Sequence, residues 1–469
     1  MSKGLKPSYY TYLFDLEDGS QMAFNAMSGA FVKISNDNYD SVYRILTKPQ
    51  EFSARDENEK GLLESAIRGR FVVDEDLDEF QLLKFRSNVG RYSTELLHLT
   101  IMPTLDCNFV CPYCYENPEK GKMQQAEQDA LCRWVDEKLI SARVMEVAWF
   151  GGEPLLAVDV MRNLTSRFKE MCEDHSVEFK AGLTTNAFYL IPKIVDDLKD
   201  LGITFCQVTL DGPPEEHDRR RKLRNGKGSF KRIIDNLVYL CENTEEVFVT
   251  LRVNFDIDSF EKIPELFPHI PDAVRMKSQI YFRQVHPPPQ WWDATAPTKV
   301  SSVPRNVTSI DTINLQKMAQ DQGFMLFMIS HTLKAGYCEA DFLNHYVIDP
   351  KNNLHACTVA FDEEHRVGYI TPEGQAVMNT PMMATWLMRE SLDKGNCRWC
   401  KILPLCMGGC AFNTLCHKGK AVCSTVSDDR TIVENLRMLH RNLIVGESRK
   451  HLVKLPEGAR RRKVGLIDG

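Results

Sequence analysis

The chain has 469 residues, of which 43% are hydrophobic and 26% are charged, and its formal net charge at pH 7 is −6. A chain of this length can bury the cores of two or three domains. The acidic balance argues against a general binder of nucleic acids or membrane surfaces, because such proteins usually carry a basic excess. We therefore expect no nucleic-acid or membrane partner.

The sequence indicates a reducing compartment. No apolar run approaches the roughly 18 residues that cross a bilayer, and the first ten residues, MSKGLKPSYY, lack the hydrophobic stretch of a signal peptide. We expect a cytoplasmic protein, in which the fifteen cysteines stay reduced. Clustered cysteines then indicate metal ligands rather than disulfides. The basic run Ala459–Lys463 is interpreted as a solvated tail.

The first block predicts a small N-terminal α/β domain over residues 1–93. Apolar and aromatic segments flank the turn Asp18-Gly19, which is typical of a β-hairpin. A helix is expected at Tyr39–Leu46. This block contains no catalytic constellation.

The second block, from Glu95 to about Val285, alternates strand-like and helix-like segments. Repeated strand-helix units imply parallel strands covered by helices. Six such strands predict a partial (β/α)6 TIM-like barrel in a core domain of residues 94–334. The strands are expected near residues 96–102, 144–150, 177–185, 203–210, 246–255 and 278–285, and helices at Met123–Ile140, Val158–Asp174 and Phe230–Glu242.

Two of these strands have one polar face. Side chains alternate along a strand, so the polar residues of FVTLRVNFD and CQVTLD fall opposite the apolar ones. A closed barrel fills its interior with branched apolar residues, so a polar inner face indicates a cavity for ligands, although a solvent face is the alternative. The polar members are Thr250, Arg252 and Asn254 in one strand and Gln207, Thr209 and Asp211 in the other.

The segment LDCNFVCPYCYENPEKG, residues 105–121, carries three cysteines directly after the first barrel strand, where parallel barrels place their active sites. A structural zinc site would need a fourth ligand from elsewhere, and a disulfide would leave one thiol over. A [4Fe-4S] cluster bound by three thiolates would keep one iron open. These cysteines are Cys107, Cys111 and Cys114.

The third block follows the insertion HPPPQWWDATAPTK and an expected helix near Leu315–Lys334. Eight of the fifteen cysteines lie in its 86 residues from Cys338 to Cys423, which predicts a metal-binding domain. Zinc remains possible for CRWCKILPLCMGGC, because its four cysteines could complete a tetrahedral site.

The motif CxxxCxxC, with Tyr113 before its last cysteine, resembles the radical S-adenosylmethionine (SAM) superfamily. The resemblance implies that Cys107, Cys111 and Cys114 hold a catalytic [4Fe-4S] cluster whose open iron binds the amino and carboxylate groups of SAM. FGGEPLL resembles the family's GGEP motif, and TTN and LDGPPEEHDRRR resemble its later strand ends. The SAM contacts implied are Tyr113 beside the adenine, Gly151, Gly152 and Glu153 toward the amino group, Asn186, and Arg221 toward the carboxylate.

The C-terminal cysteines resemble a SPASM domain, which carries two auxiliary [4Fe-4S] clusters, and we assign it to residues 335–430. The family pattern implies three clusters per chain, about twelve irons. Asn344 stands where some relatives have a fourth ligand to the first auxiliary cluster, and Cys416 is unassigned. A C-terminal helix and basic tail follow at residues 431–469. The implied ligands are Cys338, Cys357 and Cys410 for the first auxiliary cluster and Cys397, Cys400, Cys406 and Cys423 for the second.

The resemblance implies an oxidoreductase that cleaves SAM to methionine and 5'-deoxyadenosine. FNAMSGAF, residues 24–31, resembles the extension of ribosomal-peptide (RiPP) maturases, which suits leader-peptide capture by strand addition. We therefore expect a precursor peptide as substrate, a thioether or other side-chain crosslink as product, and an electron donor such as flavodoxin or ferredoxin. Two alternatives remain: an anaerobic sulfatase-maturing, formylglycine-forming enzyme, which Thr358 after Cys357 disfavours, and a zinc-bound scaffold or redox sensor without enzymatic activity.

Overall fold

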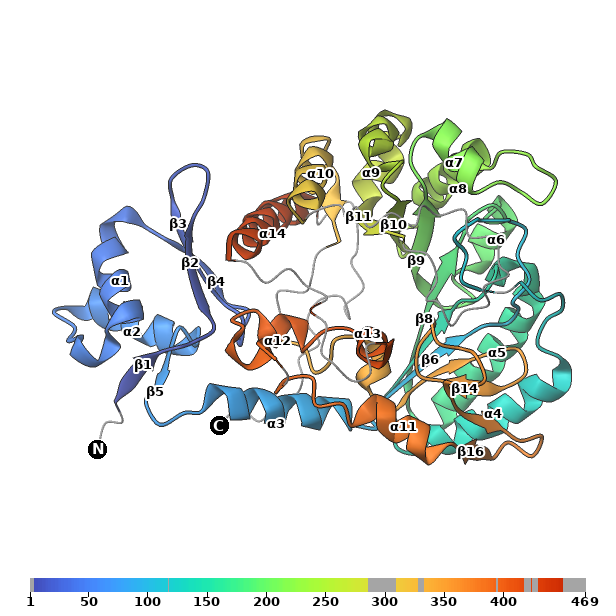
Figure 1. Cartoon of the computed structure of the whole chain (residues 1–469), viewed down its shortest axis with the longest axis horizontal. Helices are drawn as coiled ribbons and strands as arrows, with labels where there is room; N and C mark the ends of the chain where they lie inside the picture. Colours follow the sequence, from blue (N-terminus) through green and yellow to red (C-terminus); the bar gives the residue numbers. More distant parts are fainter. Residues whose placement is uncertain are drawn as a thin grey trace. The chain divides into compact units, whose positions relative to one another are not determined.

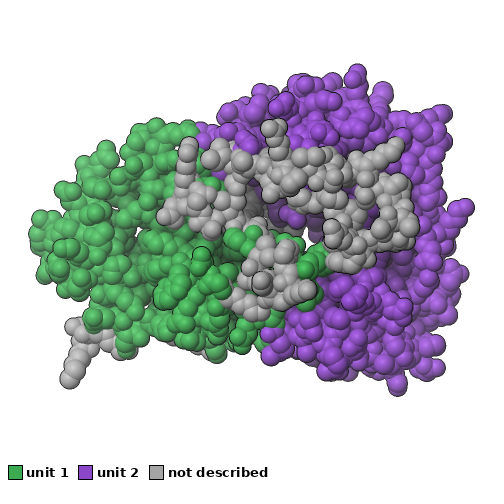
Figure 2. Space-filling model, viewed as in Figure 1, with its two compact units in different colours: residues 1–92, 329–342, 389–440 green, residues 93–328, 343–388, 441–469 purple. Residues whose placement is uncertain are grey.

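The computed structural model describes residues 4–116, 118–285, 309–327, 333–393, 395–416, 423 and 429–449. The chain forms two compact units, coloured separately in Figure 2. Unit 1 comprises residues 1–92, 329–342 and 389–440, and unit 2 comprises residues 93–328, 343–388 and 441–469. The predicted tail at 459–463 and the insertion at 286–299 lie outside the described residues. The four-domain division remains a prediction.

Unit 2 contains the predicted barrel (Figure 1). Neighbouring strands from β6 to β11 are all parallel, and each pairs with the next in the chain. This order confirms the partial TIM-like barrel. The strands are β6 (Leu96–Ile101), β7 (Val144–Trp149), β8 (Glu178–Thr185), β9 (Ile203–Leu210), β10 (Phe248–Phe255) and β11 (Ser278–Gln284).

The same sheet extends beyond the barrel strands at both edges. On one side β12 (Met325–Leu326) pairs parallel with β11. On the other, β13 (His345–Ile348) pairs parallel with β6, and an antiparallel meander follows. Its members are β14 (Asn353–His355), β15 (Arg366–Ile370) and β16 (Ala376–Met378), with α11 (Thr380–Leu387) after them.

The barrel helices cover the sheet with apolar stripes. In α5 (Val158–Asp174) the buried residues Met161, Leu164 and Phe168 recur at helical spacing. The four cysteines of these helices and strands, Cys132, Cys172, Cys206 and Cys241, are all buried. The other elements are α4 (Gln125–Leu139), η3 (Pro154–Ala157), α6 (Pro192–Asp197), α7 (Pro214–Arg220), α8 (Phe230–Asn243), η4 (Phe260–His269), α9 (Asp272–Lys277) and α10 (Ser309–Asp321).

The helix expected at Leu315–Lys334 is wrong in its extent. Helix α10 ends at Asp321, and Gly323 then adopts a φ of 83° while its N–H donates to the Gln320 carbonyl. A left-handed glycine after the last turn terminates a helix. The chain then enters β12.

The N-terminal part of unit 1 is a small α/β fold. The predicted hairpin is β2 (Thr11–Asp15) and β3 (Gln21–Asn25), and β4 (Phe31–Ile34) completes an antiparallel sheet. The predicted helix is α1 (Tyr39–Thr47). The remaining elements are β1 (Leu5–Pro7), η1 (Asn36–Asn38), η2 (Pro49–Glu51), α2 (Glu57–Arg68), β5 (Val72–Asp74) and α3 (Glu79–Arg91).

The C-terminal part of the chain is built from short elements. They are η5 (Glu339–Asp341), η6 (Cys397–Trp399), α12 (Leu403–Cys406) and α13 (Ala411–Cys416), followed by the longer α14 (Asp429–Arg449). Over the described residues, none of the helices combines the length and the apolar character that crossing a membrane requires.

Candidate active site

The three-cysteine loop follows β6 and is tied to the segment after α7. The Val110 N–H donates to the Lys222 carbonyl over 3.1 Å, and the Arg224 N–H donates to the Asn108 carbonyl over 3.0 Å. Phe109 and Leu223 form an antiparallel β-bridge between these bonds. The stretch between the first two cysteines is therefore fixed by main-chain pairing.

The two glycines of the FGGEP segment let the β7 end lie against this loop. Gly151 has a φ of 106°, a conformation that favours glycine. A Cβ on Gly152 would lie 2.5 Å from the Leu105 carbonyl oxygen and closer still to that of Asp106. The Glu153 N–H donates to the Asp106 carbonyl over 2.9 Å. Close backbone approach at this point requires glycine.

Glu153 joins the loop region to the end of β8. Its side chain is fully buried, and its carboxylate accepts hydrogen bonds from Thr185 Oγ1 at 2.7 Å and from the Asn186 N–H at 2.8 Å. Burial raises the pKa of this carboxyl group, while these bonds lower it. Asn186 in turn donates to Asn108 Oδ1 at 2.8 Å, and its Nδ2 lies 3.9 Å from the sulfur of Cys107.

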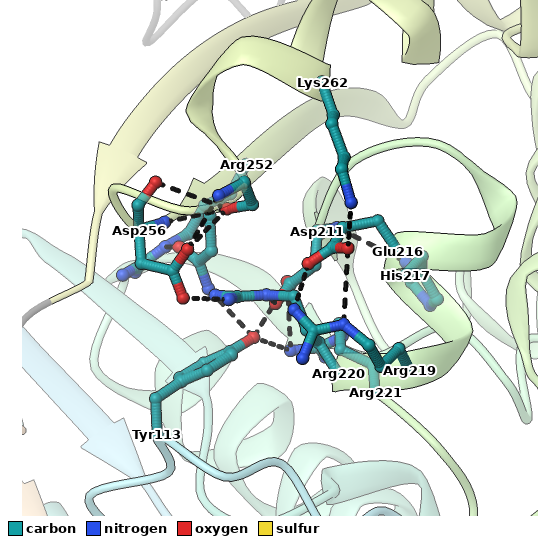
Figure 3. Close-up of polar contacts among 12 residues, drawn as sticks. Tyr113, Asp211, Glu216, His217, Arg219, Arg220, Arg221, Arg252, Asp256 and Lys262 are labelled. Atoms are coloured by element: carbon teal, nitrogen blue, oxygen red, sulfur yellow. Dashed lines mark hydrogen bonds and ion pairs between the residues drawn. The ribbon is translucent and has the colours of Figure 1, made fainter. Parts of the chain in front are cut away.

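Tyr113 is the centre of a polar network between the loop and the strand ends (Figure 3). Its hydroxyl donates to Asp211 Oδ1 at 2.8 Å and accepts from Arg221 Nη1 at 2.9 Å and Asn254 Nδ2 at 3.3 Å. Asp211 and Asn254 belong to the predicted polar faces of two strands. These faces therefore meet the three-cysteine loop.

Arg220 extends this network across the strand ends. Its Nε lies 3.0 Å from Asp211 Oδ2, and its Nη1 pairs with Asp256. Its guanidinium carbon lies 5.1 Å from the centre of the Tyr113 ring. The structure thus gives Arg220 and Asp256 central positions that sequence reasoning missed. The run of three arginines in LDGPPEEHDRRR was their available signal.

The loop thiols are poor ligands until they lose their protons. Burial raises the pKa of Cys107 to about 12 and also raises the pKa values of Cys111 and Cys114. Cluster ligation requires thiolates, so it must release protons here. The positive charge of Arg221 acts in the opposite direction on Cys107 and Cys111, lowering both pKa values.

Arg221 also meets the requirement for an anion-binding residue. Its side chain is buried, and among the described residues its Nε has no hydrogen-bond partner. A buried, unpaired donor on a charged group is costly, so a bound carboxylate would satisfy it. The donor set of the loop, three thiols beside a buried guanidinium, therefore fits an iron-sulfur cluster carrying an anionic ligand.

The four cysteines assigned to the second auxiliary cluster come together within unit 1. Burial is the largest cause of the raised pKa of Cys397, and the neighbouring thiolates of Cys406, Cys400 and Cys423 raise it further. Burial lowers the pKa of Lys334. The negative charges of the nearby Cys406 and Cys338 raise it, but by less. The sequence-assigned quartet is thus a spatial cluster.

The residues assigned to the first auxiliary cluster are divided between the units. Cys338 and Cys410 belong to unit 1, whereas Cys357 belongs to unit 2, where its charge acts on Tyr115. Asn344 is buried and donates to the carbonyls of Thr94 and Leu96, so it holds the start of β6. Cys416 ends α13 and is exposed, not packed.

Comparison with known proteins identifies one family over the barrel. Residues 101–267 match the Radical SAM superfamily. A probable GTP 3',8-cyclase of Methanococcus maripaludis strain C5 is 29% identical over 169 residues, 35% of this chain and 51% of that protein. The sporulation killing factor maturation protein SkfB of Bacillus subtilis is 27% identical over 158 residues, 33% of this chain and 35% of that protein. The chain thus spans about half or less of the length of these relatives.

A solved structure shares the fold of most of the chain. It is native anSMEcpe with bound AdoMet, which aligns with a TM-score of 0.55 and 17% identity over 75% of this chain and 99% of that chain. The same protein with AdoMet and the Cp18Cys peptide aligns with a TM-score of 0.54 and 16% identity over the same shares. At this identity the likeness concerns the fold.

Proposed function

We propose that the protein is a radical SAM oxidoreductase that modifies a ribosomally made peptide, because residues 101–267 match the Radical SAM superfamily. The observation that carries the proposal is the three-thiol loop, held between buried Glu153 and the Tyr113–Arg221 network. When bound, the [4Fe-4S] cluster and SAM supply a 5'-deoxyadenosyl radical that abstracts hydrogen from an unactivated carbon.

The chain's own residues hold and orient these groups. Cys107, Cys111 and Cys114 would bind the cluster, and Arg221, whose Nε has no hydrogen-bond partner among the described residues, would receive the carboxylate of SAM. Tyr113, fixed by Asp211 and Asn254, keeps that guanidinium in place. Gly151 and Gly152 keep the β7 end against the loop, where they would contact the amino group of SAM. The quartet led by Cys397 would hold one auxiliary cluster within unit 1. The family pattern implies that Cys338, Cys357 and Cys410 would bind a second.

The substrate class rests on the N-terminal sheet and on one relative. SkfB, a maturation protein, is 27% identical over its aligned part. In unit 1, β4 pairs with β3 on one side, and the other edge of β4 can receive an extended leader peptide. At the opposite edge, the β2 carbonyls of Thr11 and Asp15 accept bonds from Lys401 and Arg437. The β4 edge is therefore the favoured leader site, and the product we propose is a thioether or another side-chain crosslink.

Replacing Cys107, Cys111 and Cys114 together by Ala tests the catalytic assignment. We expect 5'-deoxyadenosine formation to fall to background while about eight of about twelve irons remain, because the auxiliary sites draw on other thiolates. Chromatography of the SAM products and anaerobic iron and sulfide analysis measure both. Continued SAM cleavage would place the catalytic cluster elsewhere, and stoichiometric zinc in place of iron would favour the scaffold alternative.

A proline at the β4 edge tests the leader site. The pairing of Asn25 with Ala30 makes Ala23–Val32 and Gln21–Ile34 the hydrogen-bonded pairs, so the Lys33 N–H points away from β3. Lys33→Pro should weaken peptide affinity about tenfold or more, because it removes a ladder donor. Lys33→Thr keeps that donor and serves as the control. Equal peptide affinity of the two variants in a fluorescence-anisotropy titration would move recognition away from this edge.

A further inference from the structure

Residues 219–232 form the basic segment, RRRKLRNGKGSFKR, in which eight of fourteen residues are Lys or Arg and none is acidic. The whole chain carries 58 basic and 64 acidic residues, so this concentration is a local departure from the overall charge. The segment begins at the end of α7, crosses a turn at Gly226 and enters α8.

The basic segment presents two faces with separate roles. Arg220 and Arg221 are buried in the network around Tyr113. The other face is exposed to solvent, and its side chains make no contacts in that network. Its cations are Lys222, Arg224, Lys227, Lys231 and Arg232.

Three of these exposed cations border an open groove of about 600 Å³. Its apolar floor includes Phe188, Ile191 and Leu223, and Lys227, Lys231 and Arg232 line its sides. Arg232 is fixed there, because its guanidinium carbon lies 4.3 Å from the Phe188 ring centre and its Nε donates to the Phe188 carbonyl over 3.0 Å.

Two acidic residues also line the groove, and both are engaged. Asp218 Oδ1 accepts hydrogen bonds from the N–H groups of Ser229 and Phe230, at the start of α8. Asp235 pairs with Lys231 over 2.7 Å. Three cations and two carboxylates line the groove, so its lining carries a net charge of +1.

The floor of the groove lies directly against the three-cysteine loop. The rings of Phe188 and Phe109 are 6.1 Å apart, and Leu223 forms a β-bridge with Phe109. The Phe109 N–H in turn points at the sulfur of Cys107, 3.4 Å away. One layer of side chains and backbone thus separates the groove from the cysteine that begins the loop.

We propose that this basic groove is the docking surface for an acidic one-electron carrier protein with a flavin or iron-sulfur centre. The inference rests on the proposed function, which requires reduction of the cluster at Cys107, Cys111 and Cys114. The carrier loses one electron and the cluster gains it, and no atom is transferred. Exposed lysines attract an acidic partner and raise its association rate. A partner bound on the apolar floor would be separated from the three-cysteine loop by one layer of side chains and backbone.

The binding test uses the cluster-loaded enzyme and oxidised flavodoxin as the probe. The variant Lys227→Glu/Lys231→Glu reverses two exposed charges, and Lys60→Glu/Lys199→Glu makes the same charge change at exposed positions outside the basic segment. Isothermal titration calorimetry should show a Kd at least about tenfold weaker for the first variant and within about twofold of wild type for the control. Wild-type affinity should also fall as salt rises from about 50 to 200 mM. If both variants weakened flavodoxin binding equally, the net charge of the enzyme would explain the effect, and the proposal would be overturned.

A turnover test separates this inference from the proposed function. With titanium(III) citrate as reductant, the Lys227→Glu/Lys231→Glu variant should form 5'-deoxyadenosine at the wild-type rate, whereas with reduced flavodoxin it should be about tenfold slower. A wild-type enzyme inactive with titanium would refute the proposed function itself. A variant that keeps full flavodoxin binding and turnover would refute the docking surface. A variant that loses peptide affinity under titanium would assign the groove to the substrate instead.

Discussion

The two cysteine-rich regions of the molecule are supported by different chemistry. In unit 2, the loop of Cys107 to Cys114 lies among buried charged side chains: burial raises the pKa values of Cys107 and Cys111, the charge of Glu153 adds to this at Cys107, and Arg221 acts in the opposite direction on both. In unit 1, the strongest electrostatic neighbours of Cys397 are three other cysteines, which raise its pKa. Four thiolates brought together repel one another unless a metal centre neutralises them. We therefore propose that the folded protein arranges the first region by itself, whereas the second would be completed only when its clusters bind.

The backbone supports this contrast. The loop is held by main-chain bonds to residues 222–224, far along the sequence. Around the quartet, many bonds are local, such as those from the Cys400 N–H to Cys397 and from the Cys406 N–H to Ile402. Met407, Gly408 and Gly409 all have positive φ values, of 55°, 85° and 80°, so the chain turns sharply before Cys410. Short helical turns are marginal without outside support.

Gly152→Ala should produce the largest effect, and on the loop alone. The added Cβ would press on the carbonyls of Leu105 and Asp106, and backbone cannot yield as a flexible side chain does. Overpacking of this kind costs about 1–3 kcal/mol or more and displaces the cysteines. We expect 5'-deoxyadenosine formation to fall at least about a hundredfold, since misplacement of about 1 Å can have that effect. Iron analysis should still find about eight irons. Loss of all iron would contradict the view that the loop and the C-terminal cysteines are held independently of each other.

Gly408→Ala is the matched change in unit 1. A Cβ there would lie 2.6 Å from the Ser391 Cβ and 2.8 Å from its carbonyl oxygen, at a φ of 85°. The strain and the clash should displace Cys406 and Cys410, leaving about four irons at the loop. SAM cleavage without peptide should persist within about threefold of wild type while peptide modification is lost. Abolished SAM cleavage would show that the loop depends on the C-terminal region.

Glu153→Gln should have a smaller effect that is confined to stability. The amide keeps one acceptor oxygen, but its NH2 group replaces the other and then faces either the donors on Oε1, Thr185 Oγ1 and the Leu155 N–H, or the Asn186 N–H on Oε2. We expect the free energy of unfolding of unit 2 to fall by about 1–3 kcal/mol. Chemical denaturation followed by tryptophan fluorescence measures it, with the exposed change Glu178→Gln as control. An unchanged midpoint would mean that this buried link contributes no net stability.

His217→Gln should give the smallest effect, and one that depends on pH. The contacts of the two ring nitrogens fit a neutral imidazole. Nδ1 accepts a hydrogen bond from the Asp211 N–H at 3.3 Å, and Nε2 lies 3.1 Å from Ser229 Oγ. Burial, then the charges of Arg221 and Arg220, hold the pKa of His217 well below its usual value. Below pH 6.5 unfolding takes up a proton that the folded state excludes, so this contribution falls as pH falls.

The stability difference between wild type and His217→Gln should therefore shrink by about 1.4 kcal/mol per pH unit below about 6.5 and stay constant above it. Thermal melts at pH 5.5, 6.5 and 7.5 measure that difference. A difference that is the same at all three values would show that the pKa of His217 does not change on folding, which would contradict the lowered pKa.

The barrel could be predicted from the sequence because its strands and helices follow strong local patterns. The β9 boundaries, Ile203–Leu210, match the expectation, and the three-cysteine loop follows β6, where a barrel places its site. The helix near 315–334 could not be bounded, because Gly323 ends it through a conformation that residue periodicity does not encode.

The supporting network was harder to predict than the ligands. Cys107, Cys111 and Cys114 are recognisable by spacing, whereas Arg220 reaches Asp211 and Asp256 only through folding. The exposed half of the basic segment was also missed, because overall net charge hides a local excess. The assignment of each cysteine to a cluster remains a prediction from the family pattern.

Hydrogen-deuterium exchange of the protein with and without its clusters tests the central contrast most directly. If the protein arranges the loop, backbone amides in residues 222–224, and those of Gly152 and Glu153, keep their protection when a chelator removes the iron. If the clusters complete the quartet, amides in residues 397–410 lose protection under the same treatment. Equal loss in both regions, or loss at the loop with protection kept at 397–410, would contradict the account.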